Sequence, residues 1–367
     1  MKILHLNSNY NTSTIYKQLY SSLEKNDVTQ YVYIPVKKDF KLFKETLKVE
    51  NDTKNTTHYF RKIITNLENK LFFPKIYKMY QNVKKEISMK EIDLIHAHST
   101  FSNGFVAYLL KKKFNIKYIV AFRSTDYKVF NSCFLFRIIL KKIMLESEKI
   151  VFINYPYKNK VIDDYFKYFK EKIEIIPNGV DNYWINNKVL DKKNNNNKIK
   201  FITIGYFIER KNFEYVINLI NQISDEYDTE LTIIGEGPLE DKLNSLISNK
   251  KNMKLLPWMP KEKLKNLLRE NDIFILPSSN ETFGLVYLEA LSQGLSIIYK
   301  KDDGIDGYID EKFGFGCTLD LEKDKKSLKD FLKNKKDNYK FDINKFSWNE
   351  IAKIYCQLYF NIINFNN

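Results

Sequence analysis

Cysteine is scarce in this 367-residue chain. The three cysteines, Cys133, Cys317 and Cys356, lie far apart, and no two of them have the CxxC spacing of a metal or redox motif. The sequence therefore offers neither a disulfide framework nor a cysteine-based metal site. We expect the protein to work in a reducing, cytoplasmic environment.

Long apolar runs are also missing. The stretch MKILHLNSNY at the N-terminus has no extended apolar region and predicts a first strand, not a signal peptide. The most apolar run, residues 134–140 (FLFRIIL), contains Arg137 and is far shorter than the roughly 20 residues that cross a membrane. We expect no membrane span.

Acidic residues are under-represented in the first half only. Residues 1–180 carry 32 Lys and Arg against 17 Asp and Glu, a net charge of 32 − 17 = +15. The rest of the chain carries 60 − 32 = 28 basic and 45 − 17 = 28 acidic residues, a net charge of zero. A basic first half indicates an anionic partner, such as a membrane surface, a pyrophosphate-bearing lipid or nucleic acid. Within it, residues 57–90 mix aromatic side chains with eight Lys and Arg. That mixture is typical of an interfacial membrane helix and also of an ordinary surface helix.

Short apolar runs alternate with longer segments of helical periodicity, the pattern of βαβ units on a parallel sheet. We expect strands at 2–6, 30–34, 94–97, 118–122, 150–154 and 173–176, then at 201–204, 231–234, 253–256, 273–276 and 295–299. The polar, Asn-rich stretch 187–200 between the two sets predicts a linker. The predicted fold class is α/β, with two doubly wound domains, 1–180 and 181–345, facing across a cleft. A terminal helix within 346–367 is expected to pack back toward the first domain.

The stretch SNETFGLVYLEA, residues 279–290, places a glycine turn between an apolar strand and a helix. Ligands of doubly wound sheets bind at the carboxyl ends of the strands, where helix N-termini attract phosphate. Gly284 lets the backbone approach such an anion, while Glu281 and Glu289 can accept hydrogen bonds from hydroxyl groups on either side of it. This pattern fits a sugar–diphosphate–ribose ligand. The alternative is that Glu281 only complements the helix dipole and that Glu289 is a solvated helix residue.

Two cations and an aromatic residue follow other strands of the second half. Arg210 and Lys211 come just after the strand 201–204 and ahead of a helix, where they can neutralise a diphosphate. An ordinary surface pair is the alternative. Trp258 lies in the loop after the strand 253–256, where its ring is placed to hold a nucleotide base.

The segments IPNGVD, GYFIERKN, LTIIGEGPLEDKL, DIFILPSSNETFGLVYLEALSQGLSII and FSWNEIAKIY resemble, in order and spacing, glycosyltransferase family 4. These are retaining enzymes of GT-B fold with an E-x7-E motif. The resemblance implies that Glu289 holds the ribose of a nucleotide-sugar donor and that Glu281 contacts the donor sugar. Arg210 and Lys211 would stabilise the leaving diphosphate.

The resemblance also implies that the backbone N–H groups of Gly284, Leu285 and Val286 help to bind the diphosphate. The remaining donor-site candidates are Gly205, Trp258, Thr282 and Phe283. The resemblance implies neither a metal nor a cofactor beyond the co-substrate, a UDP- or GDP-linked sugar, and no DxD motif is placed like a metal site.

The first half departs from the family pattern. In a segment that resembles the family's HGxD, this chain has YIVAFRSTDY, so Arg123 replaces the histidine while Asp126 keeps the acid. Arginine stays charged and is a poor general base, so we interpret Arg123 as a positioning cation, with an Arg123–Asp126 ion pair that only shapes the loop as the alternative. His96 and His98 lie on the same side of the strand 94–97 and its extension. His98 is nearer the carboxyl end and is a candidate catalytic residue, or else a core histidine.

The sequence thus predicts a retaining glycosyltransferase that acts on a glycan or lipid-linked acceptor in surface polysaccharide assembly, in the cytoplasm and at the inner face of the plasma membrane. Two alternatives keep the same fold: a sugar-nucleotide epimerase and a non-catalytic subunit of a glycan-assembly complex. An NAD-dependent oxidoreductase is disfavoured because NSNYNTST, not GxGxxG, follows the first strand. No groove-reading or stacking motif supports a nucleic-acid partner.

Overall fold

The computed structural model describes residues 1–39, 53–165, 167–189, 198–335 and 340–364. The chain divides into two compact units. Unit 1 comprises Met1–Ile153, Tyr157–Gly179 and Trp348–Asn367, and unit 2 comprises Asn154–Pro156 and Val180–Ser347. The sequence-based boundary, after residue 180, lies one residue beyond the main division, and the terminal helix is part of unit 1.

Unit 1 is built on a parallel sheet with strand order β3-β2-β1-β4-β5-β6-β7. Its strands are β1 (Lys2–Leu6), β2 (Thr29–Lys37), β3 (Thr56–Ile64), β4 (Leu94–Ala97), β5 (Tyr118–Phe122), β6 (Lys149–Phe152) and β7 (Ile173–Ile175). Its helices are α1 (Ile15–Glu24), α2 (Asn66–Lys70), α3 (Phe72–Glu86), α4 (Ser102–Phe114), α5 (Ser124–Ser132), α6 (Phe134–Glu146), α7 (Tyr155–Tyr165) and α14 (Trp348–Asn364).

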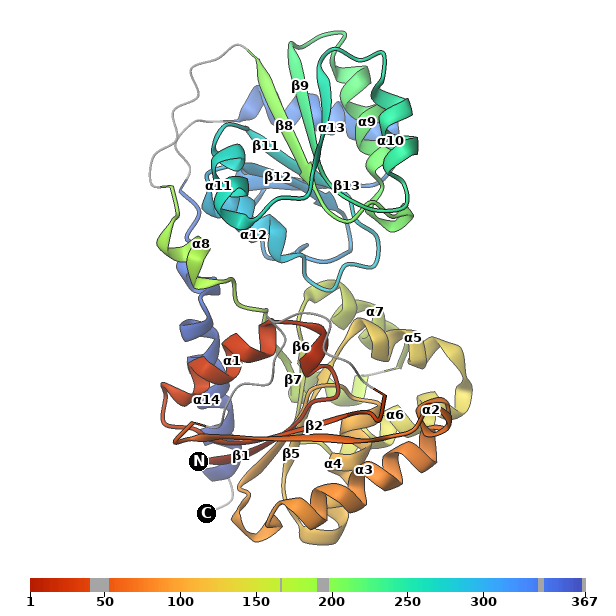
Figure 1. The fold of residues 1–367 in the computed structure, drawn as a ribbon, viewed down its shortest axis with the longest axis vertical. Helices are drawn as coiled ribbons and strands as arrows, with labels where there is room; N and C mark the ends of the chain where they lie inside the picture. The colour runs from red at the N-terminus through yellow and green to blue at the C-terminus, as the bar shows by residue number, and fades with distance from the viewer. Residues whose placement is uncertain (40–52, 166, 190–197, 336–339, 365–367) are drawn as a thin grey trace. The chain divides into compact units, whose positions relative to one another are not determined.

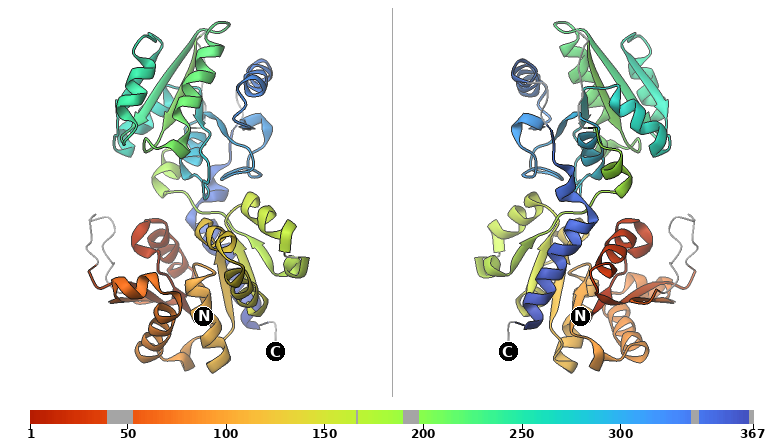
Figure 2. Two further views of the ribbon diagram at one scale, coloured as in Figure 1. Left: turned by 90° about the vertical axis from the view of Figure 1, so that its right-hand side faces the viewer. Right: turned by 90° about the vertical axis from the view of Figure 1, so that its left-hand side faces the viewer.

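Helices cover both faces of this sheet (Figure 1). Successive strand residues point to opposite faces, so Leu4 joins the core under α3, α4 and α6, whereas Ile3 joins the core under α1 and α14. Figure 2 shows α14, in blue, beside α1, in red. The buried positions of α14, at 348, 351, 352, 355, 358, 359 and 362, follow the spacing of one helix face. The C-terminal helix therefore completes the hydrophobic core around the first strand.

Unit 2 is a second parallel sheet, with strand order β10-β9-β8-β11-β12-β13. Its strands are β8 (Ile199–Ile204), β9 (Thr229–Gly235), β10 (Met253–Pro257), β11 (Ile273–Leu276), β12 (Ser296–Lys300) and β13 (Gly314–Cys317). Its helices are α8 (Asn182–Asn186), α9 (Phe213–Ile223), α10 (Glu240–Ile247), α11 (Lys261–Arg269), α12 (Leu285–Ser292) and α13 (Leu321–Asn334). Both units are Rossmann-like, which confirms the predicted α/β fold class.

The prediction missed two edge strands and misread one segment. β3 is half-exposed along most of its length, and its charged residues Arg61 and Lys62 interrupt the alternation that marks a strand. Residues 57–90 are therefore not one helix: they begin in β3 and continue as α2 and α3. β13 is only GFGC, which is too short and glycine-rich to be recognised. Most of the predicted linker, residues 190–197, lies outside the described residues.

Membrane crossing was not expected from the sequence. In the part of the chain that the structure describes, none of the helices combines the length and the apolar character that a bilayer span requires.

Candidate active site

The candidate site lies where the chain reverses direction through the unit 2 sheet. From β8 the chain moves outward to β9 and β10, then returns to β11 on the other side of β8. The loops after β8 and β11 are therefore neighbours, at the switch point where ligands of such sheets bind. Hydrogen bonds join them: Ser279 N donates to Arg210 O at 2.7 Å, and Asn212 Nδ2 donates to Pro277 O at 2.7 Å.

Two predicted site residues, Lys211 and Arg210, contact the carboxylate of a third, Glu281, between these loops. Glu281 Oε2 accepts hydrogen bonds from Lys211 Nζ at 2.7 Å, from Ser278 Oγ at 3.1 Å and from Arg210 Nη1 at 3.4 Å. The side chains of Lys211 and Glu281 are only 12% and 17% exposed, whereas that of Arg210 is 44% exposed. Burial alone would raise the pKa of Glu281, but Lys211, Arg210 and Ser278 outweigh it and lower that pKa. The group, which we call the Glu281 cluster, thus combines one carboxylate with two cations and has a net positive charge.

Asp303 holds the turn that presents Glu281. Its carboxylate accepts from the backbone amides of Asn280 at 2.6 Å, Glu281 at 2.9 Å and Gly304 at 3.0 Å, and only 5% of its side chain is exposed. Sequence reasoning missed this residue, although it follows β12 at the same edge of the sheet as Glu281. Its role is to fix the backbone, so that the Glu281 carboxylate is held in one position.

Helix α12 begins directly after this turn. Gly284 precedes it with φ = +83°, in the left-handed region that favours glycine. The first amides of the helix, those of Leu285 and Val286, have no intrahelical acceptor and lie at the positive end of the helix dipole. An anion at this N-terminus would be bound by the backbone, as the sequence predicts for residues 282–286.

We expect Gly284→Ala to destabilise the protein. A Cβ atom here would lie 2.3 and 2.5 Å from two carbons of the Tyr287 ring, in addition to the unfavourable φ. The left-handed conformation alone costs an alanine about 1–3 kcal/mol. Urea unfolding of Gly284→Ala should show at least that loss. Gly205→Ala is the matched control, because its Cβ would be no nearer than 3.4 Å to any neighbour, and an equal loss there would contradict this account.

Glu289 lies further along α12, on the side that packs against α8. Burial raises the pKa of its carboxyl to about 7, and Asp181 adds to this, while Lys261 and a hydrogen bond from Trp184 act in the opposite direction. Glu289 is therefore not the solvated helix residue of the alternative interpretation. It is a partly buried acceptor whose charge changes near neutral pH.

The remaining predicted donor-site residues have different surroundings. Gly205 follows β8, where an added Cβ would lie 3.8 Å from the Lys211 side chain, so this residue adjoins the Glu281 cluster. The Phe283 side chain is buried in the core against Tyr308, at 5.4 Å between ring centroids, which leaves its backbone as the part able to bind a ligand. Thr282 O accepts from Asn154 Nδ2. Trp258 is 63% exposed, and β9 lies between its strand and β8.

Arg123 and Asp126 belong to unit 1 and form the start of α5. The Asp126 carboxylate accepts from the backbone amides of Arg123 and Phe101, both at 2.9 Å. Burial raises the pKa of Asp126 to about 6 although these amides and the Arg123 charge oppose it. Asp126 therefore shapes the loop as a helix cap. The Arg123 guanidinium donates through Nε to His98 O at 3.4 Å and is only partly buried, so it remains available as a positioning cation.

His98 does not face an open site in unit 1. Its ring is fully buried, and Nε2 lies 3.0 Å from His5 Nδ1 in a hydrogen bond. The ring therefore offers no exposed nitrogen to a substrate, and the structure favours the core-histidine interpretation over the catalytic one. His5 was not predicted as its partner, because only the pairing of β1 with β4 brings the two residues together.

Comparison with known proteins gives two family matches that together span most of the chain. The family "Glycosyltransferase Family 4" matches residues 15–182, and "Glycosyl transferases group 1" matches residues 186–348. An uncharacterized glycosyltransferase of Methanocaldococcus jannaschii is 26% identical over 266 residues, which is 71% of each chain.

Two solved structures have similar folds. The apo form of the lipopolysaccharide outer core galactosyltransferase WaaB superposes with a TM-score of 0.71 at 16% identity, covering 100% of this chain and 99% of that one. Anabaena HepE in complex with UDP and glucose superposes with a TM-score of 0.63 at 15% identity, covering 98% and 99%.

Proposed function

The chain belongs to glycosyltransferase family 4, and on that basis we propose that it moves a sugar, with retention of configuration, from a nucleotide-sugar donor to a hydroxyl group of a glycan or lipid-linked acceptor. The observation that carries this proposal is the Glu281 cluster beside the N-terminus of α12, with Glu289 on the same helix. These groups match, in kind and in order, the parts of a sugar–diphosphate–ribose molecule.

The donor is proposed to lie along the start of α12. Its diphosphate would be bound by the amides of Leu285 and Val286 and by Lys211 and Arg210, which the buried carboxylate of Glu281 holds in place. Glu289 lies five residues beyond Gly284, about 7 Å along the helix axis, and would accept hydrogen bonds from the ribose hydroxyls. Since HepE, a solved structure of similar fold, was determined with UDP and glucose, UDP-sugars are the first donors to test and GDP-sugars the second.

The proposed reaction is a same-face substitution at the anomeric carbon. The bond from that carbon to the diphosphate oxygen breaks, the acceptor oxygen forms the new bond on the same face, and the acceptor proton passes to the leaving phosphate. Negative charge grows on the diphosphate in the transition state, where Lys211 and Arg210 stabilise it in a partly buried setting. In this proposal the two cations take the place of a catalytic metal ion.

A transfer assay tests the reaction type. The purified protein is incubated with the UDP-sugar that it binds and with a simple acceptor glycoside, and the product is examined by proton NMR. If the anomeric bond of the donor is axial, the new glycosidic bond is expected to be axial as well. Inversion at the anomeric carbon, or release of a modified free sugar without any transfer, would contradict the proposed mechanism.

We propose that the acceptor is presented at an anionic membrane surface on the cytoplasmic side, contacted by unit 1. Large apolar side chains are exposed on two helix segments here: Phe134, Leu135 and Ile138 on α6, and Leu67, Phe73 and Tyr77 on or beside α2 and α3. The segments adjoin, since the rings of Phe72 and Phe136 pack at 6.0 Å. Basic residues lie on the same helices: Lys75, Lys78, Lys84, Lys85, Arg137, Lys141 and Lys142. Such a combination is typical of surfaces that insert shallowly into anionic lipid.

Vesicle co-sedimentation tests this surface. The double variant Phe134→Ser, Ile138→Ser should bind vesicles containing phosphatidylglycerol about tenfold more weakly than the wild type, because it removes two apolar side chains from the interface. The control is Ile354→Ser, Phe360→Ser, which removes two exposed apolar side chains from α14. Binding of the wild type should also weaken as salt is added. Equal binding by both variants would contradict a role for this surface.

A further inference from the structure

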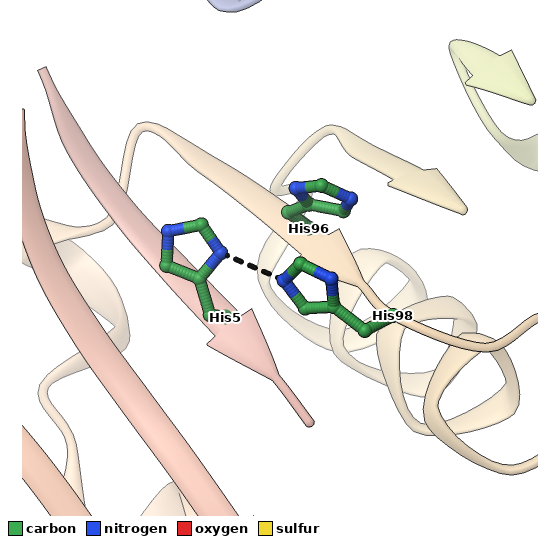
Figure 3. A group of neighbouring side chains, drawn as sticks. All are labelled: His5, His96 and His98. Carbon is green, nitrogen blue, oxygen red and sulfur yellow. Dashed lines mark hydrogen bonds between the residues drawn. The ribbon is translucent and has the colours of Figure 1, made fainter. Parts of the chain in front are cut away.

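Three histidines from two strands gather on one face of the unit 1 sheet (Figure 3). His5 lies in β1 and His96 in β4, where the two are direct partners in the parallel register. His98 follows the end of β4 and, two residues after His96, points to the same face. The ring centroids are 4.0 Å apart for His96 and His98, 5.3 Å for His5 and His98, and 5.5 Å for His5 and His96.

These rings offer a set of ligand atoms for a metal ion. One ring nitrogen from each histidine lies within 4.8 Å of the others, and all three side chains are fully buried. In a tetrahedral zinc site with bonds of about 2.0–2.1 Å, ligand nitrogens are about 3.3 Å apart. His5 Nδ1 and His98 Nε2 are already 3.0 Å apart. The third nitrogen lies within 4.8 Å of these two, so metal binding would require it to move closer.

The hydrogen bonds of the cluster leave buried nitrogen atoms unexplained. Each ring has one nitrogen with a partner, whereas His96 Nε2 and His98 Nδ1 have none. Buried polar atoms without a partner are rare in folded proteins, and His96 Nε2 is the one of these atoms that a metal ion bound beside His5 Nδ1 and His98 Nε2 would satisfy. Burial lowers the pKa of His5 and a hydrogen bond with the Gln30 side chain raises it, so Gln30 is the neighbour of the second nitrogen of this ring. A metal ion held by His5 Nδ1, His96 Nε2 and His98 Nε2 would take the lone pair of His96 Nε2 and replace the hydrogen bond between His5 and His98.

A second layer of contacts orients the rings. His96 Nδ1 lies 2.7 Å from Tyr359 Oη. In the tautomer that donates from Nδ1 to this hydroxyl, Nε2 carries the free lone pair, as is usual for metal-bound histidine. The Tyr355 ring lies 5.3 Å from that of His96, and the Tyr16 ring lies 5.2 Å from that of His98. Burial lowers the pKa of all three histidines, His5 to about 3, which keeps the rings in the neutral form that binds metals.

We propose that His5, His96 and His98 form a buried site for a divalent transition-metal ion that takes imidazole ligands, with Zn²⁺ as the reference ion. Three imidazole nitrogens are a known ligand set for zinc, with a water molecule in the fourth tetrahedral position. The site ties β1 to β4 and, through the His96–Tyr359 hydrogen bond, to the C-terminal helix α14. It is independent of the donor site, which belongs to unit 2. The sequence did not predict it, because His5 and His96 lie 91 positions apart in the chain.

The test uses the full chain after removal of metals with a chelator. Addition of Co²⁺ should produce the visible absorption bands of a tetrahedral ion with nitrogen ligands, and Zn²⁺ should abolish them at one ion per chain. Zn²⁺ should also raise the melting temperature by several degrees. A wild type that shows neither the bands nor the rise would overturn the proposal, whatever its donor binding.

Matched variants identify the ligands. His96→Gln and His98→Gln should lose the Co²⁺ bands and the stabilisation by Zn²⁺. His58→Gln removes the fourth histidine of the chain, which lies on β3 outside this group, and should keep both. Circular dichroism checks that each variant is folded. If a variant is unfolded, the Co²⁺ and Zn²⁺ titrations of the wild type alone decide whether the chain binds the metal. Metal binding that is lost in His58→Gln, or retained in His96→Gln and His98→Gln, would contradict the assignment. Donor binding by the same samples reports separately on unit 2.

Discussion

Replacement of Lys211 by methionine is expected to reduce kcat about 10²–10³-fold while the fold persists. In the proposed reaction, Lys211 stabilises the charge that develops on the leaving diphosphate, and loss of one such preorganised group typically has an effect of that size. Its ammonium group is largely buried against Glu281 at 2.7 Å, so it is already in position before the donor binds. Initial-rate kinetics with a saturating UDP-sugar measure the change.

The control for this prediction is Lys254→Met. Lys254 also forms an ion pair in unit 2, with Glu230 at 2.6 Å, but it lies on β10, away from the switch point between β8 and β11. Its loss should leave kcat unchanged. Lys211→Arg, which keeps the charge, should retain more activity than Lys211→Met. If Lys211→Met and Lys254→Met had the same kcat, Lys211 would be no more than a structural partner of Glu281.

Replacement of Glu289 by glutamine is expected to change donor affinity and stability in opposite directions. The carboxylate accepts stronger hydrogen bonds from ribose hydroxyls than the amide does, so the donor Kd should rise about tenfold or more at pH 8. The pKa of about 7 makes this difference depend on pH. Wild-type affinity should increase as the pH rises through 7, whereas the affinity of Glu289→Gln should stay flat.

The free energy of unfolding of the wild type should decrease over the pH range in which its donor affinity increases. Because the folded-state pKa of Glu289 is raised from 4.5 to about 7, its protonated form favours the folded state, and this contribution is lost as the pH rises from about 4.5 through 7. Glu289→Gln should therefore gain stability relative to the wild type across that window, by about 3 kcal/mol. Urea unfolding at pH 4.5 and pH 8 measures the difference. Glu240→Gln, on the exposed surface of α10, is the control, and a similar pH dependence there would refute the assignment to Glu289.

Periodicity predicted the buried strands of both sheets because they are continuous apolar runs with helical segments between them. β4, β5 and β11 agree with their predicted bounds to the residue. The edge strands β3 and β13 could not be found this way. An edge strand has one hydrogen-bonded neighbour and side chains that are partly in water, so neither a buried run nor a clean alternation marks it.

The site residues that directly follow neighbouring strands were predicted from the sequence. The site residues that act from distant segments of the chain were not. Glu281 and Lys211 follow β11 and β8, which are adjacent, so sequence order and the rules of doubly wound sheets were enough to bring them together. Asp303 and Trp184 act on the backbone and on Glu289 from other segments, and no spacing in the sequence marks them. The histidine cluster shows the same limit, since only the register of β1 with β4 places His5 beside His96.

The central claim, that unit 2 binds a nucleotide-sugar through the Glu281 cluster and Glu289, is tested most directly by calorimetric titration of the purified protein. UDP, GDP and a panel of their sugar conjugates are titrated into the wild type, Lys211→Met and Glu289→Ala. The account predicts that one nucleotide series binds the wild type at a single site, and that both variants weaken this binding at least tenfold. Binding of equal strength in all three proteins, or no binding of any nucleotide to the wild type, would contradict it.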